Sequence, residues 1–183
     1  MWDMEPPKVD GGMEMMRCCQ YGIYERTLIF SLKYNGNRYI ARHIAEMMRD
    51  KLIHENRDRD YDVIVPVPLH KRKERQRGFN QTALIGRHLA KELGITCMPK
   101  ALIRVKETRP MRGLSPEERA DNVSGCFEVG DYEEENLRGK RILLIEINRS
   151  ILIQSNNLRK PLISRGFRHM RLCIGEARAG FAA

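Results

Sequence analysis

Two short runs of apolar residues constrain the fold of this chain more than any other feature. The first, Tyr61–Pro68, is rich in valine and closes with prolines, and the second, Arg141–Glu146, carries four consecutive aliphatic residues. Continuous apolar runs of this length are typical of strands that are buried on both faces, as strands of parallel sheets are. The sequence therefore predicts an α/β protein with a mostly parallel sheet.

Helical patterns lie before and between these strands. Apolar spacing predicts helices from about Tyr24 and over residues 40–52, and a third helix is expected from Asn80, a good N-cap, to Gly94, a good C-cap. Ser115–Glu118 forms a capping box, which predicts a short helix. Other expected elements are strands over residues 95–105 (interrupted at Pro99), 125–129 and 169–174, and a helix over residues 155–165. In the third helix, the residues expected to face the sheet are Ala83, Leu84, Leu89, Ala90 and Leu93. Alternating strands and helices are typical of crossover units on a parallel sheet.

The length and composition fit one core. A chain of 183 residues with 42% apolar and 31% charged residues has an ordinary globular balance, and folding at this size buries roughly 70% of the surface of the unfolded chain. Residues 1–23 contain Pro6-Pro7 and Gly11-Gly12 but no periodicity. We therefore expect a loose N-terminal segment over residues 1–23 and one domain over residues 24–183.

Several patterns bear on the compartment. No stretch approaches the ~20 apolar residues of a membrane-spanning helix, and the first residues lack the basic and apolar regions of a secretory signal. The five cysteines are scattered and form no Cys-x-x-Cys pair, which suits reduced thiols better than a disulfide framework. These patterns favour a cytoplasmic protein.

A basic segment follows the first strand. Five Lys and Arg residues lie between His70 and Gly78, and the formal net charge of the chain is +9. Ligands of parallel sheets bind beyond the carboxyl ends of strands, and the free N–H groups at the start of a helix attract anions. The segment therefore predicts a loop that binds pyrophosphate or another anion, while a solvated basic loop without a ligand fits the same pattern.

The same region resembles a known family. Val63–Leu69, followed by Arg77–Gln81, closely resembles the ComF family of bacterial competence and GntX-like proteins, which have a type I phosphoribosyltransferase fold. The match runs from about Tyr24 to Ile145 and resumes around residues 162–180. Its further matching residues are Ser31, Leu32, Lys33, Tyr34 and Gly36, and downstream Leu114, Ser115, Arg119, Asn122, Val123 and Phe127.

The resemblance implies a phosphoribosyltransferase-like domain with a small hood region. An active member would bind phosphoribosyl pyrophosphate with Mg²⁺, held largely by the ligand's own phosphates, and would transfer a glycosyl group at C1 of the ribose. The residues of this chain that the resemblance and the basic segment together assign to substrate or phosphate binding are Lys71, Arg75, Arg77, Asn80, Glu146 and Ser150. No catalytic residue and no metal ligand is assigned.

This sequence departs from the family pattern at three places. Residues 1–20 lack the cysteine-rich zinc-binding segment of family members, so we expect no zinc. Met111 replaces a glutamine of the hood. Over residues 146–154, the family has two aspartates, two further residues and Thr-Thr-Gly, where this chain has Glu146 and Ile147 and then Ser150, Ile151 and Leu152.

The third departure weakens the expected phosphate cradle. Such a cradle needs inward N–H groups and room for the anion close to the backbone, but no glycine occurs between Gly139 and Gly166. We therefore expect no phosphate-binding turn over residues 146–154, an end to the second strand near Glu146, and an inward-packed apolar trio over residues 151–153. Glu146 itself either still contacts a sugar or merely ends the strand.

These expectations lead to one functional prediction and two rivals. The prediction is a phosphoribosyltransferase-like protein of the ComF type, linked to DNA uptake, with weak binding of phosphoribosyl pyrophosphate or another phosphorylated small molecule and with impaired catalysis. One rival is a non-catalytic module that binds single-stranded DNA or a competence or recombination protein through the basic loop. The other is a working transferase in which Glu146, Arg149 and Ser150 rebuild the site.

Overall fold

The computed structural model describes residues 8–10, 13–19, 22–109, 113–130, 134–147 and 168–173. Its helices are α1 (Ile23–Tyr34), α2 (Ile40–His54), α3 (Lys71–Arg77), α4 (Gln81–Leu93), α5 (Pro116–Val123) and α6 (Glu134–Leu137). Its strands are β1 (Lys8–Asp10), β2 (Met13–Arg17), β3 (Val63–Pro66), β4 (Thr96–Cys97), β5 (Leu102–Arg104), β6 (Phe127–Val129), β7 (Arg141–Glu146) and β8 (Arg168–Cys173).

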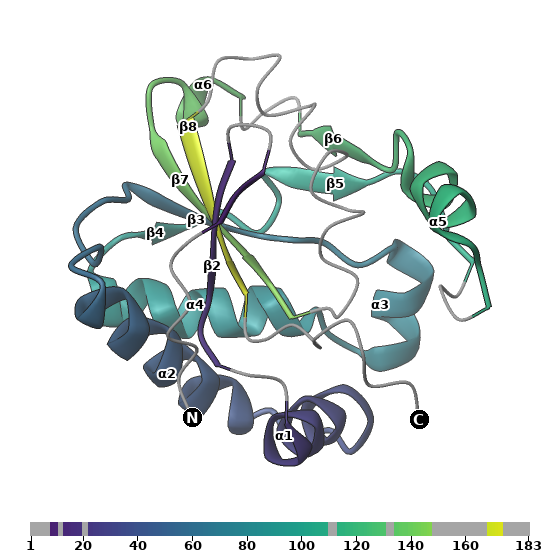
Figure 1. Cartoon of the computed structure of the whole chain (residues 1–183), viewed down its shortest axis with the longest axis horizontal. Coiled ribbons are helices and arrows are strands. Elements are labelled where there is room, and N and C mark those ends of the chain that lie inside the picture. Colours follow the sequence, from purple (N-terminus) through teal and green to yellow (C-terminus); the bar gives the residue numbers. More distant parts are fainter. Residues whose placement is uncertain are drawn as a thin grey trace.

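The main sheet is mostly parallel, as predicted. Its strand order is β1-β2-β8-β7-β3-β4, and every neighbouring pair is parallel except the antiparallel pair β1–β2. Helices α1, α2 and α4 pack on one side of the sheet, and the small antiparallel sheet β5–β6 lies on the other (Figure 1). This α/β architecture is consistent with a phosphoribosyltransferase-like fold.

The two central strands separate two apolar clusters. Ile64 of β3 and Leu143 and Ile145 of β7 pack with α1, α2 and α4. The alternate residues of the same strands pack with β5, β6 and α6, which is the period-two pattern of a strand buried on both faces. The alternate residues are Val63, Val65, Ile142 and Leu144. The interpretation of both apolar runs as doubly buried strands is confirmed.

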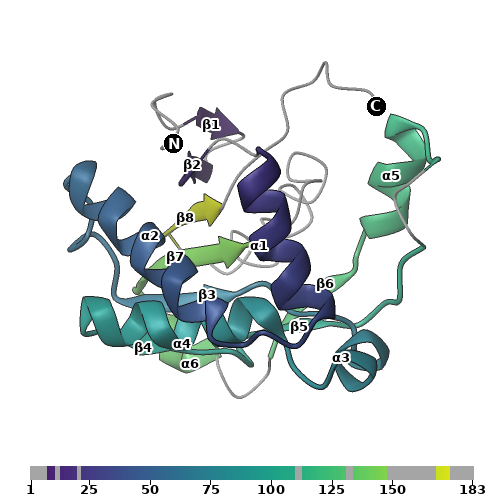
Figure 2. The same cartoon turned by 90° about the horizontal axis from the view of Figure 1, so that it is seen from below.

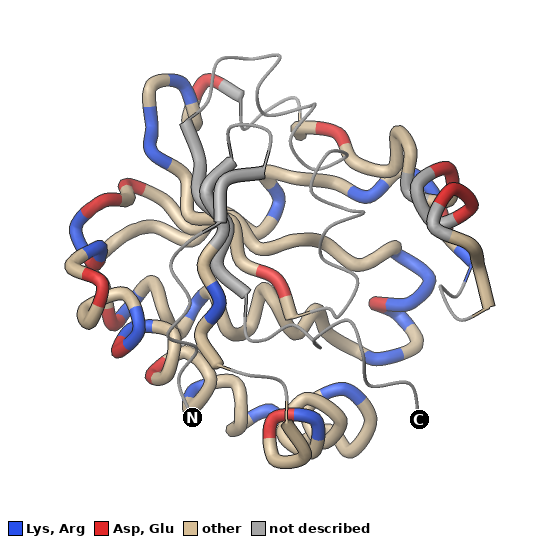
Figure 3. The backbone as a smooth tube through the Cα atoms, in the orientation of Figure 1, with Lys and Arg blue, Asp and Glu red and all other residues tan. Residues whose placement is uncertain are grey.

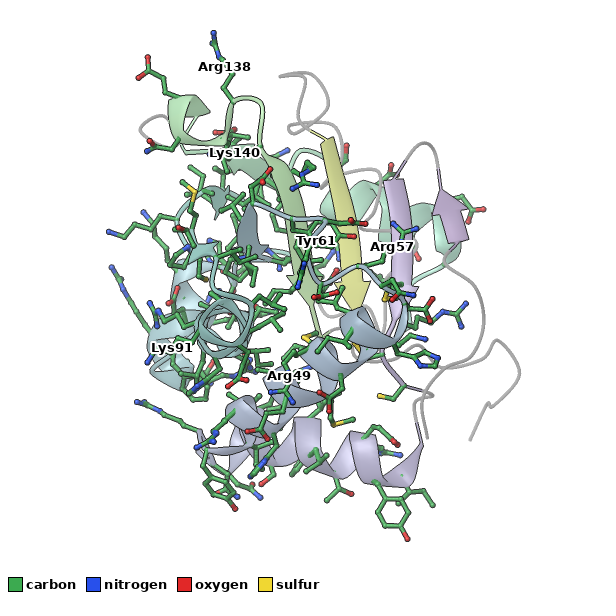
Figure 4. The ribbon with its side chains drawn as sticks, turned by 90° about the vertical axis from the view of Figure 1, so that its left-hand side faces the viewer. Arg49, Arg57, Tyr61, Lys91, Arg138 and Lys140 are labelled. Atoms are coloured by element: carbon green, nitrogen blue, oxygen red, sulfur yellow. The ribbon has the colours of Figure 1, made fainter. Side chains whose placement is uncertain are left out.

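Helix α4 packs closely on the sheet. A Cβ atom at Gly86 would lie 3.0 Å from Ile145 Cδ1 and 3.2 Å from Cys97 Sγ, so the glycine permits the close approach. Ile85 is buried on the same side, whereas Leu84 and Leu93, which were expected to face the sheet, are half-buried at its margin. Arg49 of α2 donates to Glu92 of α4 at 2.6 Å and ties the two helices together (Figure 4).

Local capping signals were reliable. Helix α4 begins after Asn80 and ends at Gly94, which has a φ of 67°, and α5 begins after Ser115 with both hydrogen bonds of the capping box. Strand β7 has the predicted bounds and ends at Glu146, and β8 lies within one residue of the strand predicted over residues 169–174. The helix predicted over residues 155–165 lies outside the described residues.

Three expectations need correction. Within the segment expected to be loose, Lys8–Asp10 and Met13–Arg17 are strands, because β2 pairs with the distant strand β8. The stretch from residue 95 to 105 is two strands of different sheets, since β4 pairs with β3 and β5 with β6. The division of the chain at residue 23 stays a prediction.

The third correction concerns the basic segment, which is helix α3 rather than a loop. His70 caps its start by accepting a hydrogen bond from the Arg72 N–H at 3.4 Å. Gly78, with a φ of 80°, closes its end, where its N–H donates to the Glu74 carbonyl at 2.7 Å.

Among the described helices, none has the length and apolar character needed to cross a bilayer.

Candidate anion-binding site

The candidate site lies at the carboxyl ends of β3 and β7. Pro66 pairs with Ile145, and the Val67 N–H donates to the Ile145 carbonyl at 3.0 Å, so the two strands end side by side. The Val67 carbonyl accepts a hydrogen bond from Thr82 Oγ1 at 2.7 Å. This contact anchors the start of α4 directly against the end of β3.

Asn80 builds this junction. Its Oδ1 accepts hydrogen bonds from the Thr82 N–H at 3.1 Å and from Thr82 Oγ1 at 2.7 Å, and its Nδ2 donates to the Val67 carbonyl at 3.5 Å. The side chain is buried. Asn80 therefore caps α4 and closes the turn, and contact with a ligand stays a prediction for this residue.

Helix α3 presents cations on two opposite faces. Residues two positions apart on a helix point in nearly opposite directions, and residues four apart share a face. Lys71 and Arg75 are exposed on one face, whereas Lys73 and Arg77 are half-buried on the other. Figure 3 shows the gathering of basic residues along this helix. Two of the predicted ligand-binding residues thus lie on the outer face of α3.

The half-buried face of α3 belongs to a cluster of charges from four elements, which we call the cationic cluster. Its members are Lys33 of α1, Lys73 and Arg77 of α3, Arg104 of β5 and the carboxylate of Glu146 of β7. Four cations face Glu146, and Lys73 is also attracted by the half-exposed carboxylate of Glu107, which leaves a formal excess of two positive charges. Partial burial of this excess favours an anionic ligand.

The electrostatics of the cluster show that its members interact. Burial and repulsion by Arg77 lower the pKa of Lys33 to about 8, against a smaller attraction by Glu146 that raises it. Burial and repulsion by Arg104 and Arg77 lower the pKa of Lys73, against an attraction by Glu107. Burial also lowers the pKa of Arg104, against an attraction by Glu146.

Aromatic rings hold the arginines in place. The Arg77 guanidinium lies 5.5 Å from the centre of the Tyr34 ring, and Arg104 lies 5.4 Å from that of Phe127. Arg104 also donates to Thr108 Oγ1 at 2.5 Å. Both guanidinium groups are therefore positioned by contacts that leave donors for a ligand.

The first two residues of the altered loop, Glu146 and Ile147, lie at the end of β7 and are described by the structure. Glu146, at the first aspartate position of the family pattern, is 1% exposed, and Ile147, at the second, is 7% exposed and packs in the core on the α2 side. An isoleucine buried in this core offers no oxygen to a ribose. The rest of the altered loop, including Ser150 and the trio over residues 151–153, lies outside the described residues, as does Met111.

The structure brings together Arg77 and Glu146 of the predicted site and adds Lys33, Lys73 and Arg104. A helical reading of the basic segment would have grouped Lys73 with Arg77, which lie four residues apart. Lys33 belonged to the family match, in Ser31–Tyr34, but was assigned no role. Arg104 carried no local signal, because only tertiary structure places β5 beside β7.

A resident metal ion does not fit this cluster. Mg²⁺ prefers several oxygen ligands, and among the described residues the cluster offers only the carboxylates of Glu146 and Glu107 beside four cations. Across the described residues, no group of three or more His, Cys, Asp or Glu side chains is arranged to hold a metal. That Mg²⁺ would be held largely by the phosphates of the ligand stays a prediction, as does the absence of zinc.

Known proteins resemble the chain over this region. It is 28% identical over 122 residues to Competence protein F of Haemophilus influenzae, which covers 65% of this chain and 53% of that protein. It is 30% identical over 105 residues to the DNA utilization protein YhgH of Salmonella typhi, which covers 56% of this chain and 46% of that protein. YhgH of Escherichia coli K12 is 27% identical over 122 residues, 65% of this chain and 52% of its own length.

These comparisons confirm the resemblance to ComF-type proteins at the level of distant homology. No protein-family model matches the chain. The matched region spans about half the length of each of these relatives.

Proposed function

We propose that the chain is a phosphoribosyltransferase-like protein of the ComF type that binds a phosphorylated ligand of the phosphoribosyl pyrophosphate class weakly, with impaired catalysis. The observation that carries the proposal is the cationic cluster at the carboxyl end of the sheet, where this fold class binds its ligands. The names of the relatives, a competence protein and a DNA utilization protein, support a role in the uptake or use of DNA. The proposed location is the cytoplasm.

In this proposal the cluster neutralises the pyrophosphate. Lys73 and Arg77 lie on the half-buried face of α3, and Lys33 adds a cation whose charge depends on pH. Hydrogen bonds from charged donors contribute about 1.5–3 kcal/mol each, so these side chains supply most of the affinity. Glu146 is the remaining acceptor for a ribose hydroxyl at the end of β7.

Impaired catalysis follows from the altered loop. Ile147 is committed to the core, and Ile151 and Leu152 replace hydroxyl and glycine positions of the family pattern. Each lost donor to a charged group costs roughly 1.5–3 kcal/mol. Loss of two donors lowers affinity for the 5′-phosphate and ribose by roughly two to four powers of ten.

The first test compares two residues by calorimetry with pyrophosphate and phosphoribosyl pyrophosphate. Arg77→Ala is expected to abolish measurable affinity, while Ser150→Ala changes it little, because binding rests on the cluster rather than the loop. Arg75→Ala is the matched control, since it removes an arginine from the exposed face of the same helix. Equal losses from Arg77→Ala and Ser150→Ala would show that the loop still works.

A second comparison restores the loop. One variant carries the full family pattern, with Asp at positions 146 and 147, Thr at 150 and 151, and Gly at 152. A second changes only residues 150–152, because an aspartate at the buried position 147 threatens folding. Both are expected to bind phosphoribosyl pyrophosphate more tightly than the native chain. Equal binding, or base-dependent turnover by the native chain, favours the working-transferase rival.

A non-catalytic DNA-associated or partner-binding module remains a second candidate. The observation that favours it is the exposed face of α3, where Lys71, Arg72 and Arg75 face solvent on a chain of net charge +9. A solvated row of cations attracts the phosphates of nucleic acid. Under this candidate the chain binds DNA and not phosphoribosyl pyrophosphate.

A further inference from the structure

Helix α1 has an apolar face that is largely exposed in the part of the chain that the structure describes. Its inward face, with Leu28, Ile29 and Leu32, packs on the core. Ile23, Thr27, Phe30 and Tyr34 follow at spacings of four, three and four residues, so they form a stripe on the opposite side of the helix. All four residues of this outer stripe are exposed.

Aromatic rings dominate the outer stripe. Phe30 and Tyr34 are 55% and 66% exposed, and their ring centres lie 4.8 Å apart with the planes inclined by 42°. The neighbouring Tyr24 and Tyr39 are also exposed. Isolated exposed apolar residues are ordinary, but two exposed rings in contact, with further exposed rings nearby in the chain, are typical of an interaction surface.

Cations flank this row of rings. Arg26 and Arg38 are exposed beside it, Arg38 stacks over Phe79 at 4.7 Å, and Arg77 covers the Tyr34 ring. Figure 2 shows the C-terminal end of α1 beside α3, which adds the cations of that helix. Glu25, the only acidic residue of α1, is engaged at the helix start, where it accepts the Gly22 N–H at 2.9 Å.

We propose that this surface binds single-stranded nucleic acid, with bases stacked on Phe30 and Tyr34 and phosphates held by Arg26, Arg38 and the exposed cations of α3. Aromatic platforms beside a cationic groove are the general means of binding single strands, since every base offers a flat face. The inference rests on the second candidate function, DNA binding, and names the surface on which the DNA would bind. A protein partner or a second copy of the chain would use the apolar area of the stripe but has no need of the flanking cations.

The test is fluorescence anisotropy with a labelled oligothymidylate and a duplex of equal length. We expect the single strand to bind more tightly, because a duplex hides its base faces. Phe30→Ala and Tyr34→Ala are each expected to weaken single-strand binding roughly tenfold. Phe30→Leu and Tyr34→Leu should weaken it similarly, since leucine keeps apolar area but has no ring.

Matched controls lie elsewhere on the surface. Ile53→Ala removes an exposed apolar residue of α2, and Arg59→Ala removes an exposed cation; neither is expected to change affinity. Arg26→Ala should instead reduce the slope of log affinity against log salt by about 0.7, the value for one phosphate of a single strand. Unchanged melting temperatures establish that each variant is folded.

Three results overturn the inference and are distinguishable. If neither DNA binds at low salt, both the surface and the second candidate function are wrong. If DNA binds but the ring variants bind as tightly as the native chain, the DNA site lies elsewhere and only the surface is wrong. If leucine restores what alanine loses, or if the native chain is a dimer that Phe30→Ala dissociates, the stripe is a protein interface.

Discussion

Lys33 is the residue whose chemistry depends most on its surroundings. It extends from the last turn of α1 between Arg77 of α3 and Glu146 of β7. Burial and the repulsion by Arg77 lower its pKa to about 8, and Glu146 offsets only part of this effect. An anion bound in the cationic cluster attracts the protonated form, so binding raises this pKa and takes up a proton.

This linkage predicts that anion affinity depends on pH through Lys33. The contribution of Lys33 is complete well below its pKa of about 8 and is lost as the pH rises through that value. Between about pH 7 and about pH 9, we expect native affinity for pyrophosphate to fall roughly five- to tenfold relative to Lys33→Arg, since one charged contact contributes about 1.5–3 kcal/mol.

The comparison with Lys33→Arg matters because pyrophosphate itself titrates in this range, and its ionisation cancels in the ratio of the two affinities. Calorimetry in two buffers of different ionisation enthalpy measures the proton uptake directly. A ratio that stays constant across the pH range contradicts a place for Lys33 in the binding site.

Among the elements, α3 and α4 decide the shape of the site. Gly78 closes α3 and the Asn80 cap opens α4 two residues later, so the chain reverses within a short turn that is tied to Val67. This arrangement directs Lys73 and Arg77 towards the ends of the strands. It also explains why Asn80 is needed even where it touches no ligand.

The cap gives a stability prediction. Asn80→Ala is expected to lower the free energy of unfolding by about 1–2 kcal/mol, because the N–H and hydroxyl of Thr82 lose their acceptor. Asn80→Asp should keep most of the stability, since aspartate caps helices well and suits the positive end of the helix dipole. Urea unfolding measures both changes. If Asn80→Ala leaves stability unchanged but lowers pyrophosphate affinity, Asn80 acts as a ligand contact instead.

At the scale of the whole molecule, segments near the two ends of the sequence complete one side of the sheet. Strand β2 lies between β1 and β8, and β8 in turn pairs with β7 along its whole length. Met16 of β2 and the adjoining Cys18 and Cys19 are buried in the same core as α1 and α2. The N-terminal strands are therefore packed and paired with the rest of the sheet, and we expect them to unfold with it.

This packing predicts that Met16→Ala destabilises the whole domain. Loss of a fully buried methionine side chain costs roughly 2–5 kcal/mol. Met47→Ala on α2 is the matched control, because Met47 is half-buried and its removal leaves a smaller cavity. In thermal and urea unfolding, the Met16→Ala variant should be much less stable than the Met47→Ala variant. Equal stabilities would mean that the segment before residue 23 is loose, as the sequence analysis predicted.

The sequence determined those parts of this protein whose causes are local. The doubly buried strands β3 and β7 follow from continuous apolar runs, and α4 and α5 follow from caps that bond to neighbours within a few residues. Arg77 and Glu146 could be assigned to the site because the basic segment and the family resemblance both place residues at the ends of the two apolar strands. Hydrogen bonds and side-chain spacing within one element act over short sequence distances, so the sequence records them.

Only the tertiary structure decided what depends on distant partners. Strand β2 exists because β8 supplies its hydrogen bonds, and its own sequence carries no periodicity that predicts this pairing. Lys33 and Arg104 join Arg77 and Glu146 only because the fold brings residues of α1 and β5 within electrostatic reach of the end of β7. The outer stripe of α1 is proposed as an interaction surface because the fold buries the opposite face, while the aromatic face is exposed among the described residues. In each case the structure depends on contacts between residues that lie far apart in the chain, and no local sequence pattern encodes such contacts.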